Sequence, residues 1–163
     1  MSPRTAAPGS APATELREVG RLRVRYGETD QMRFAYHGHA AVWFDQARTE
    51  LLRRSGSCYR DLEAAGLRLP VLALHADYHR AALYDDELDL FAGFRAVLIG
   101  GRPSPIQFEI AYVIRRGDDL CYSGWTRHCF LREAADGSRQ PVRIPAELRA
   151  LLTGAGETTN GHE

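Results

Sequence analysis

The strongest periodic pattern in this chain is helical and covers residues 40–54. Apolar residues recur there every three or four positions and would form a single stripe on an α-helix. This stripe consists of Ala40, Trp43, Phe44, Ala47 and Leu51. Charged residues such as Asp45 and Arg48 lie off the stripe, and Gly56 can end the helix because glycine accepts a left-handed conformation. The pattern therefore predicts a long amphipathic helix with one buried face.

Elsewhere apolar residues alternate with polar ones, which is typical of β-strands that bury one face. The expected elements on either side of the long helix are a strand at 22–26, a short helix at 57–65, strands at 72–78, 88–98, 106–114 and 120–131, and a last helix at 145–152. Turn signals such as Gly100-Gly101-Arg102-Pro103 separate the four later strands. Because short turns join antiparallel neighbours, these strands should form one antiparallel sheet.

The helix and the sheet each offer an apolar face, and both faces are buried if the two pack together. We therefore expect an α+β fold in which a curved antiparallel sheet wraps around the long central helix. The opposite face of the sheet is also partly apolar. Its apolar residues are Phe91, Val97, Ile99, Trp125 and Leu131. Because a single domain seldom exposes such a face, the sequence also indicates an oligomer.

The composition is that of a globular protein. The chain has 163 residues, 44% of them hydrophobic and 26% charged, and its formal net charge is zero. A net charge of zero argues against bulk nucleic-acid binding, and no apolar run approaches the roughly 18–20 residues of a membrane span. There is no signal-peptide pattern, and the three cysteines have no CxxC spacing. We therefore expect a cytoplasmic protein with free thiols and no membrane partner.

The two ends of the chain differ from its middle. Pro, Gly, Ala, Ser and Thr dominate them, which is typical of segments that cannot bury enough apolar surface to fold. We expect residues 1–19 and 154–163 to be disordered tails and residues 20–153 to form a single domain.

The candidate chemistry lies just before the long helix. Asp30 ends the segment Glu28-Thr29-Asp30, and a loop with Tyr36 and His37 then leads into the helix. The start of a helix presents unpaired N–H groups and a partial positive charge, so this order brings a carboxylate close to a site for developing negative charge. Other roles stay open: Asp30 can cap the turn, His37 can act through its ring or its amide, and Tyr36 can line a pocket or fill the core.

Three stretches of the chain resemble the hotdog-fold acyl-CoA thioesterases, specifically the 4-hydroxybenzoyl-CoA thioesterase and YbgC-like branch. They are residues 26–32 with 36–37 and 43–50, residues 78–86, and residues 124–128 followed by 141–145. The chain differs from that family at two places beside the presumed site. Arg33 stands where the family usually has glycine, and His39-Ala40 stands where it often has Asn-Tyr.

The resemblance implies a hotdog fold and the hydrolysis of an acyl-CoA or aryl-CoA to the free acid and CoA. By position, Asp30 would be the base or nucleophile, and the backbone amide of His37 would polarise the thioester carbonyl, with no metal or organic cofactor. Tyr36 and Arg80 are candidates for binding the substrate, Arg80 through the phosphates of coenzyme A. An acyl-carrier protein could also deliver the acyl group. Two chains would pair their sheets edge to edge, in a homodimer or homotetramer with active sites at the interface.

Three alternatives stay open at this point. In a hotdog enoyl-CoA hydratase, Asp30 and the His37 side chain would add water to a double bond. In a non-catalytic acyl-CoA-binding module, Arg33 would crowd the site. His75, Asp77 and His79 share one strand face, as a metal site would require. Because that face is opposite the apolar one, we expect no metal there, and we expect His128 to be a structural histidine.

Overall fold

A computed structural model of the chain describes residues 10–13, 15–56 and 59–153. In chain order its elements are β1 (Arg17–Arg23), the 3-10 turn η1 (Tyr26–Glu28), α1 (His39–Arg54), α2 (Tyr59–Ala64), β2 (Leu67–Arg68), β3 (Val71–Tyr78), β4 (Glu87–Ile99), β5 (Arg102–Arg116), β6 (Asp119–Glu133), β7 (Arg139–Val142) and α3 (Ala146–Leu152). The predicted long helix, two short helices and four later strands are all present. Only their ends differ, by a few residues.

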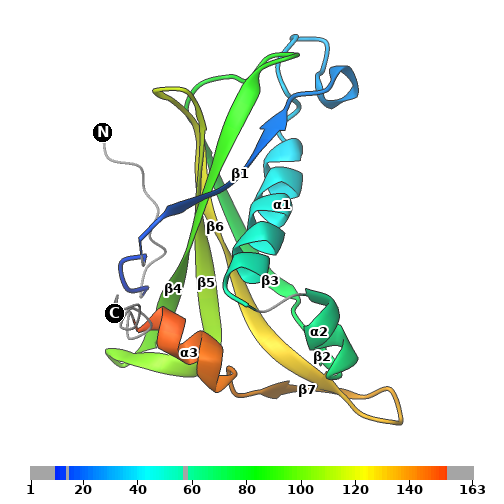
Figure 1. Ribbon diagram of the computed structural model, residues 1–163, viewed down its shortest axis with the longest axis vertical. Helices are drawn as coiled ribbons and strands as arrows, with labels where there is room; N and C mark the ends of the chain where they lie inside the picture. The colour runs from blue at the N-terminus through cyan, green and yellow to red at the C-terminus, as the bar shows by residue number, and fades with distance from the viewer. Residues whose placement is uncertain (1–9, 14, 57–58, 154–163) are drawn as a thin grey trace, which may run out of the picture.

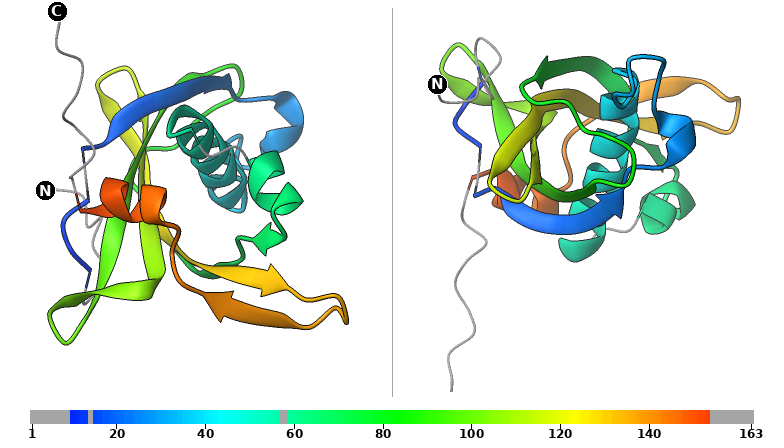
Figure 2. Two further views of the ribbon diagram at one scale, coloured as in Figure 1. Left: turned by 60° about the horizontal axis from the view of Figure 1, so that its bottom comes forward. Right: turned by 90° about the horizontal axis from the view of Figure 1, so that it is seen from above.

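The strands form one antiparallel sheet that curves around α1 (Figures 1 and 2). β1 pairs with β4, β4 with β5 and β5 with β6. β3 pairs with the other side of β6, over residues 122–128. β1 and β3 are therefore edge strands. The short strands β2 and β7 pair with the far end of β6. The sequence patterns missed both, because two and four residues are too few to show alternation.

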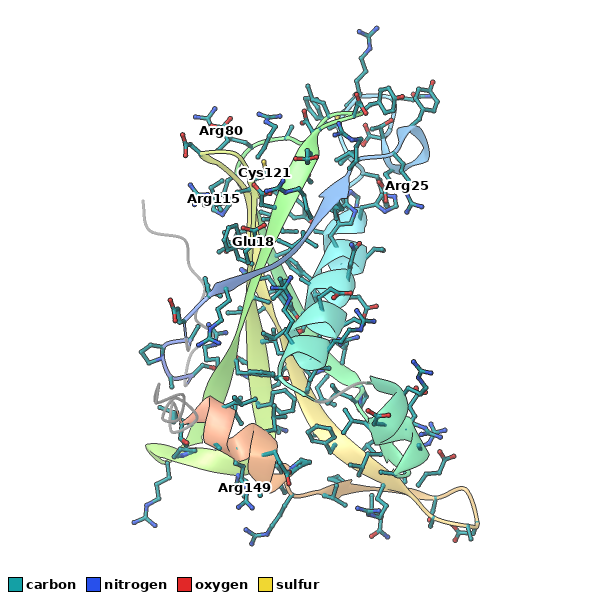
Figure 3. The ribbon with its side chains drawn as sticks, in the orientation of Figure 1. Glu18, Arg25, Arg80, Arg115, Cys121 and Arg149 are labelled. Carbon is teal, nitrogen blue, oxygen red and sulfur yellow. The ribbon has the colours of Figure 1, made fainter. Side chains whose placement is uncertain are left out.

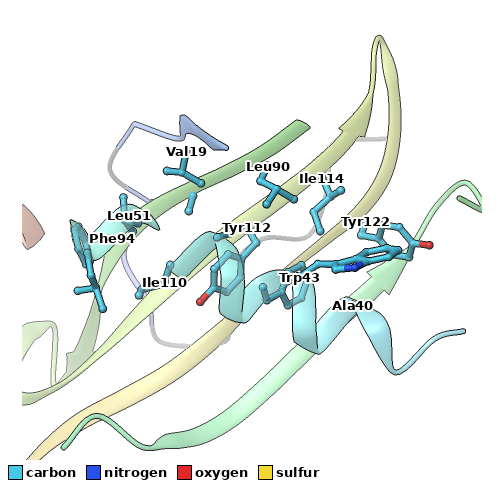
Figure 4. Close-up of a cluster of buried hydrophobic side chains, with 14 of the residues drawn as sticks. Val19, Ala40, Trp43, Leu51, Leu90, Phe94, Ile110, Tyr112, Ile114 and Tyr122 are labelled. Atoms are coloured by element: carbon cyan, nitrogen blue, oxygen red, sulfur yellow. The ribbon is translucent and has the colours of Figure 1, made fainter. Parts of the chain in front are cut away.

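The core lies between α1 and the inner face of the sheet (Figure 4). All five residues of the predicted stripe are buried, and the ring of Phe44 stacks on that of Tyr112 with 4.5 Å between centroids. Gly124 permits this approach, because a Cβ atom there would lie 2.7 Å from the Phe44 ring. Arg48 was predicted to lie off the stripe, but it is also buried and forms an ion pair with Asp45.

A polar network crosses this core. The hydroxyl oxygens of Tyr112 and Thr126 are 2.6 Å apart, Thr126 Oγ1 lies 2.7 Å from His128 Nε2, and His128 Nδ1 lies 3.0 Å from the carbonyl oxygen of Pro70. A carbonyl only accepts, so Nδ1 carries the proton, Nε2 accepts from Thr126, and Thr126 accepts from Tyr112. Burial, reinforced by the charge of Arg48, lowers the pKa of His128 to about 4. His128 is therefore the structural histidine that we predicted.

The outer face of the sheet, which we expected to be partly apolar, also holds a cluster of paired charges. Glu109 of β5 is fully buried there and forms ion pairs with Arg95 of β4 and Arg127 of β6. The hydroxyl of Ser10 also donates to Glu109, at 2.8 Å, and the N–H of Ala11 donates to a carbonyl of β4 at 3.0 Å. The first described residues therefore extend along the β4 edge and cover part of this face.

These contacts move the start of the folded region toward the N-terminus. β1 begins at Arg17, inside the range 1–19 that we assigned to a disordered tail, and Ser10 already contacts the sheet. Residues 1–9, 14 and 154–163 of the two predicted tails lie outside the described residues, as does Ser57. Among the helices that are described, none has the length and apolarity needed to span a membrane.

Candidate active site

A buried carboxylate anchors the loop between β1 and α1. Glu28 is only 5% exposed, and its carboxylate accepts hydrogen bonds from the N–H of Arg25 at 2.7 Å, the Arg25 guanidinium at 3.0 Å and the indole of Trp43 at 3.5 Å. Burial raises the pKa of Glu28, but these hydrogen bonds together hold it below its usual value. The carbonyl of Glu28 accepts the N–H of Tyr36 at 2.8 Å. Glu28 therefore fixes both ends of the loop against α1.

Asp30 lies in a tight turn within this loop. Its N–H donates to the carbonyl of Phe34 at 2.9 Å, its carbonyl accepts the N–H of Arg33 at 2.9 Å, and its Oδ1 accepts the N–H of Met32 at 2.8 Å. Asp30 thus supports its own turn, as one of the two hypotheses for this residue required. Only Oδ1 takes part, however. The second carboxylate oxygen has no hydrogen-bond partner within the described ranges, so it is available to a ligand.

The turn also explains why Arg33 is unusual. Its φ is 65°, in the left-handed region where glycine is free of strain and a side chain is not. The resemblance suggested glycine at this position, and the backbone has the conformation that a glycine would favour. Arg33 does not line the pocket described below, so it does not crowd the site as the binding-module hypothesis supposed.

The long helix begins at His39, two residues later than His37. The N–H of His39 donates to the carbonyl of Tyr36 at 2.9 Å, so residues 36–39 form a turn that leads into α1. Gly38 is the N-cap, and a Cβ atom there would lie only 2.7 Å from the Tyr36 ring. In the part of the chain that the structure describes, the N–H groups of His37 and Gly38 have no partner. The expected unpaired donor is present, but it belongs to the turn before the helix.

Asp30 and His37 line one open pocket of roughly 210 Å³. Arg80 lines it too, so the structure brings together three of the four predicted site residues. Tyr36 does not line it, and its ring lies against that of His37 with 4.2 Å between centroids. The remaining wall consists of residues that the sequence patterns did not assign to the site. These are Met32, Phe34, Ala35, Tyr78, His79, Ala81 and Tyr122.

The end of β3 supplies an important part of this wall. Tyr78 is the last residue of β3, and its hydroxyl donates to the carbonyl of His37 at 2.8 Å. Its ring packs edge-on against Tyr122 of β6 with 5.7 Å between centroids. Burial, with a smaller contribution from Tyr36, raises the pKa of Tyr78 above its ordinary value. Alternation in the sequence placed Tyr78 on the apolar face, but nothing local indicated a contact 41 residues away.

Arg80 is exposed, and its only ion pair within the described residues is with Asp119, at 3.1 Å. Figure 3 shows Arg80 and Arg25 at one end of the molecule and Arg149 at the other. An exposed pair of this kind is worth about 0–1 kcal/mol. The Arg80 guanidinium can therefore leave Asp119 for a phosphate at little cost.

The three residues considered for a metal do not converge on one point. His75 Nε2 lies 3.1 Å from Asp77, and the His75 ring stacks on Trp125, whereas His79 Nε2 lies 2.8 Å from Ser123 Oγ. Within the described ranges, no group of three His, Cys, Asp or Glu residues could hold a metal ion. The chemical groups that line the pocket are the carboxylate of Asp30, the imidazoles of His37 and His79, the phenols of Tyr78 and Tyr122 and the guanidinium of Arg80.

Residues 24–152 match the model of a family described as the thioesterase-like superfamily. YneP of Bacillus subtilis (strain 168), provisionally named an acyl-CoA thioesterase, is 33% identical over 82 residues, which are 47% of this chain and 59% of that protein. A hypothetical protein from Thermus thermophilus has a crystal structure with a TM-score of 0.69 and 30% identity, covering 84% of this chain and 98% of that one. The DHNA-CoA thioesterase of Staphylococcus aureus, 24% identical, has the same fold with a TM-score of 0.68, over 86% and 95% of the two chains. The expected hotdog fold is confirmed.

Proposed function

The chain belongs to the thioesterase-like superfamily and is a thioester hydrolase, and from this premise we propose that it cleaves an acyl-CoA or aryl-CoA to the free acid and CoA. Asp30 serves as the base or nucleophile, and the backbone N–H of His37 polarises the thioester carbonyl. One observation carries the proposal. The carboxylate of Asp30 and the turn with the unpaired N–H of His37 line the same pocket, and each keeps one polar atom without a partner in the described chain.

The chemistry needs no more than these groups. A thioester carbonyl oxygen bound to the His37 N–H gains negative charge as the carbon is attacked, and one well-aimed donor is worth about 3–4 kcal/mol. Asp30 either takes a proton from the water that attacks the carbon, or attacks the carbon itself to form a mixed anhydride, which water then hydrolyses to the free acid and the restored carboxylate. The carbon–sulfur bond breaks, water supplies the new oxygen of the acid, and the sulfur leaves as a thiolate that takes a proton. A positioned carboxylate contributes roughly 10²–10⁴ to the rate.

The coenzyme A end of the substrate has one candidate contact in the pocket. Arg80 lines the pocket and is only weakly paired, which suits a contact with the phosphates of coenzyme A or of a phosphopantetheine arm on an acyl-carrier protein. Tyr36 is outside the pocket lining, and its ring packs against that of His37, so in this proposal it supports the turn at the mouth of the pocket. The cysteines bear on the proposed location in the cytoplasm, where thiols stay reduced. Cys121 and Cys129 are buried free thiols, and burial raises the pKa of both.

A second copy of the chain completes the site in this proposal. β3 is an edge strand, and four of its apolar side chains are exposed. They are those of Val71, Leu72, Leu74 and Tyr78, of which Tyr78 lines the pocket. Two chains that pair along β3 would cover exposed apolar surface on this strand and place the two pockets at their interface, as a dimer or as a tetramer of two dimers.

A panel of acyl-CoA and aryl-CoA substrates, assayed for release of free thiol, tests the activity. At least one member should give thiol and free acid at a rate that depends on enzyme concentration. The hydratase alternative predicts a hydroxyacyl-CoA with its thioester intact, which mass spectrometry would identify. Substrate that binds but is recovered unchanged from every reaction would contradict the proposal.

Light scattering at micromolar concentration tests the assembly. We expect at least a dimer, and we expect Leu74→Arg to shift it toward monomer with loss of turnover. Val42→Arg is the matched control, because Val42 is also an exposed apolar residue but lies on α1, outside β3 and outside the apolar outer face of the sheet. A wild-type protein that is monomeric and fully active would contradict the shared site.

A further inference from the structure

Tyr78 connects the edge strand β3 to the turn that carries the unpaired amides. Its hydroxyl donates to the carbonyl of His37 at 2.8 Å, and the two residues line the same pocket although they are 41 positions apart. The edge-on contact of its ring with Tyr122 holds the phenol from the side of the sheet. The bond therefore links a loop to the rigid part of the fold.

The other contacts of this turn leave its pocket side unsupported. The N–H of Tyr36 is held by the carbonyl of Glu28 at 2.8 Å, and the carbonyl of Tyr36 accepts the N–H of His39 at 2.9 Å. The carbonyl of His37 belongs to the next peptide unit, whose N–H is that of Gly38. Apart from Tyr78, it accepts only the N–H of Ala40, at 3.3 Å and within its own helix entrance. Among described residues, Tyr78 is thus the one distant group that fixes the orientation of this peptide.

We propose that Tyr78 is a positioning residue, which orients the turn 36–39 so that its unpaired N–H groups meet the carbonyl oxygen of the substrate. The inference rests on the proposed function, because a donor lowers the barrier only if it is already aimed at the place where charge develops. A hydrogen bond to the His37 carbonyl also polarises that peptide unit and makes its N–H, which is that of Gly38, a better donor beside the N–H of His37. A tyrosine hydroxyl keeps its proton at neutral pH, and burial raises the pKa of Tyr78 further, so the donor that this role needs is present.

Tyr78→Phe tests the proposal, because it removes the hydroxyl and keeps the ring against Tyr122. We expect kcat to fall about tenfold, the rate equivalent of one lost hydrogen bond, with KM within about twofold. Tyr26→Phe is the control: Tyr26 lies in the same part of the chain as the site loop, and its hydroxyl makes no hydrogen bond within the described residues. It should leave kcat and KM unchanged. An unchanged kcat in Tyr78→Phe, or a raised KM alone, would overturn the positioning role.

Hydrogen exchange measured by mass spectrometry separates this proposal from the proposed function. The segment 34–40 should exchange faster in Tyr78→Phe than in wild type, while the strands β4 and β5 exchange as before. If the wild type released no thiol from any substrate, the proposed function would have failed, and exchange alone would judge Tyr78. Faster exchange would then support its hold on the turn, and unchanged exchange would overturn it.

Discussion

The Asp30 loop and the polar network of the core differ in whether their polar groups have hydrogen-bond partners. In the core, the side chains of Tyr112, Thr126 and His128 are hydrogen-bonded in series, and the last of them donates to the backbone carbonyl of Pro70. In the loop, one oxygen of Asp30 and the N–H of His37 keep no partner within the described residues. Burying an unpaired polar group costs roughly 1–3 kcal/mol, but water can satisfy such a group in an open pocket. Pairing therefore separates the two regions more clearly than residue type does.

The difference assigns separate consequences to the two regions. Paired groups in the core stabilise the fold, so changes there should alter the free energy of unfolding. Unpaired groups in the loop are available to a substrate, so changes there should alter turnover and leave stability nearly constant. The four predictions below test this separation, from the largest expected effect to the smallest.

Asp30→Asn should have the largest effect on turnover of any change in the loop. The amide keeps an oxygen that can accept from Met32, so the turn survives, but it can neither attack nor take a proton. We expect kcat to fall by at least about 10², with the thermal unfolding midpoint nearly unchanged. Asp61→Asn on α2 is the control, since Asp61 is exposed and outside this pocket. A variant with near-wild-type kcat would exclude Asp30 as the catalytic carboxylate.

Acid should lower the free energy of unfolding through His128 in the core network. The pKa of His128 is about 4 in the folded chain, against 6.5 for an ordinary histidine, so the unfolded chain binds the proton more readily. The stabilisation is complete above pH 6.5 and is lost as the pH falls toward 4, by about 3 kcal/mol in all. Urea unfolding at a series of pH values measures the loss. His128→Gln should unfold at lower urea at pH 7 and should lack this part of the slope. An equal slope in both proteins would contradict the assignment.

His37 distinguishes the backbone from the side chain within the loop. His37→Ala should keep kcat within about tenfold, because the N–H survives, whereas His37→Pro should lower it by about 10² or more. Proline is tolerated at the second position of the turn 36–39, and the lost N–H has no partner in the described chain. Circular dichroism should be native for both. If His37→Ala alone abolished turnover, the imidazole would act directly, and the hydratase hypothesis would gain support.

Arg33→Gly should have the smallest effect, a slight gain in stability with little change in turnover. Glycine relieves the left-handed backbone at φ 65° but makes the unfolded chain more flexible, so the net gain in stability should not exceed about 1 kcal/mol. Because Arg33 does not line the pocket, kcat should stay within about twofold. Arg33→Ala removes the charge and keeps the strain, so it should give no gain. A gain of the same size from alanine would assign the effect to charge.

Local patterns in the sequence predicted most of the fold. The stripe on α1 and the alternation along β3 to β6 each repeat many times, and a repeated period is hard to mistake. Asp30 and His37 could be paired in advance because seven residues and one loop separate them. Tyr78 could not, because its link to His37 depends on how β3 lies beside the loop. The burial of Glu28 and the cover that Ser10 forms over Glu109 depend on packing in the same way.

The place of β1 in the sheet has a consequence for synthesis. Within the described residues β1 pairs with β4 alone, and β4 begins at Glu87, about 60 residues after β1 ends at Arg23. The hydrogen bond from Ser10 to Glu109 spans 99 positions. At translation rates of roughly 5–20 residues per second, β1 leaves the ribosome several seconds before its partner strand exists. The β4–β5–β6 meander can pair locally as it emerges. The first strand to be made is therefore among the last to dock, and the nascent chain carries an unpaired strand and an uncovered apolar helix face until it does.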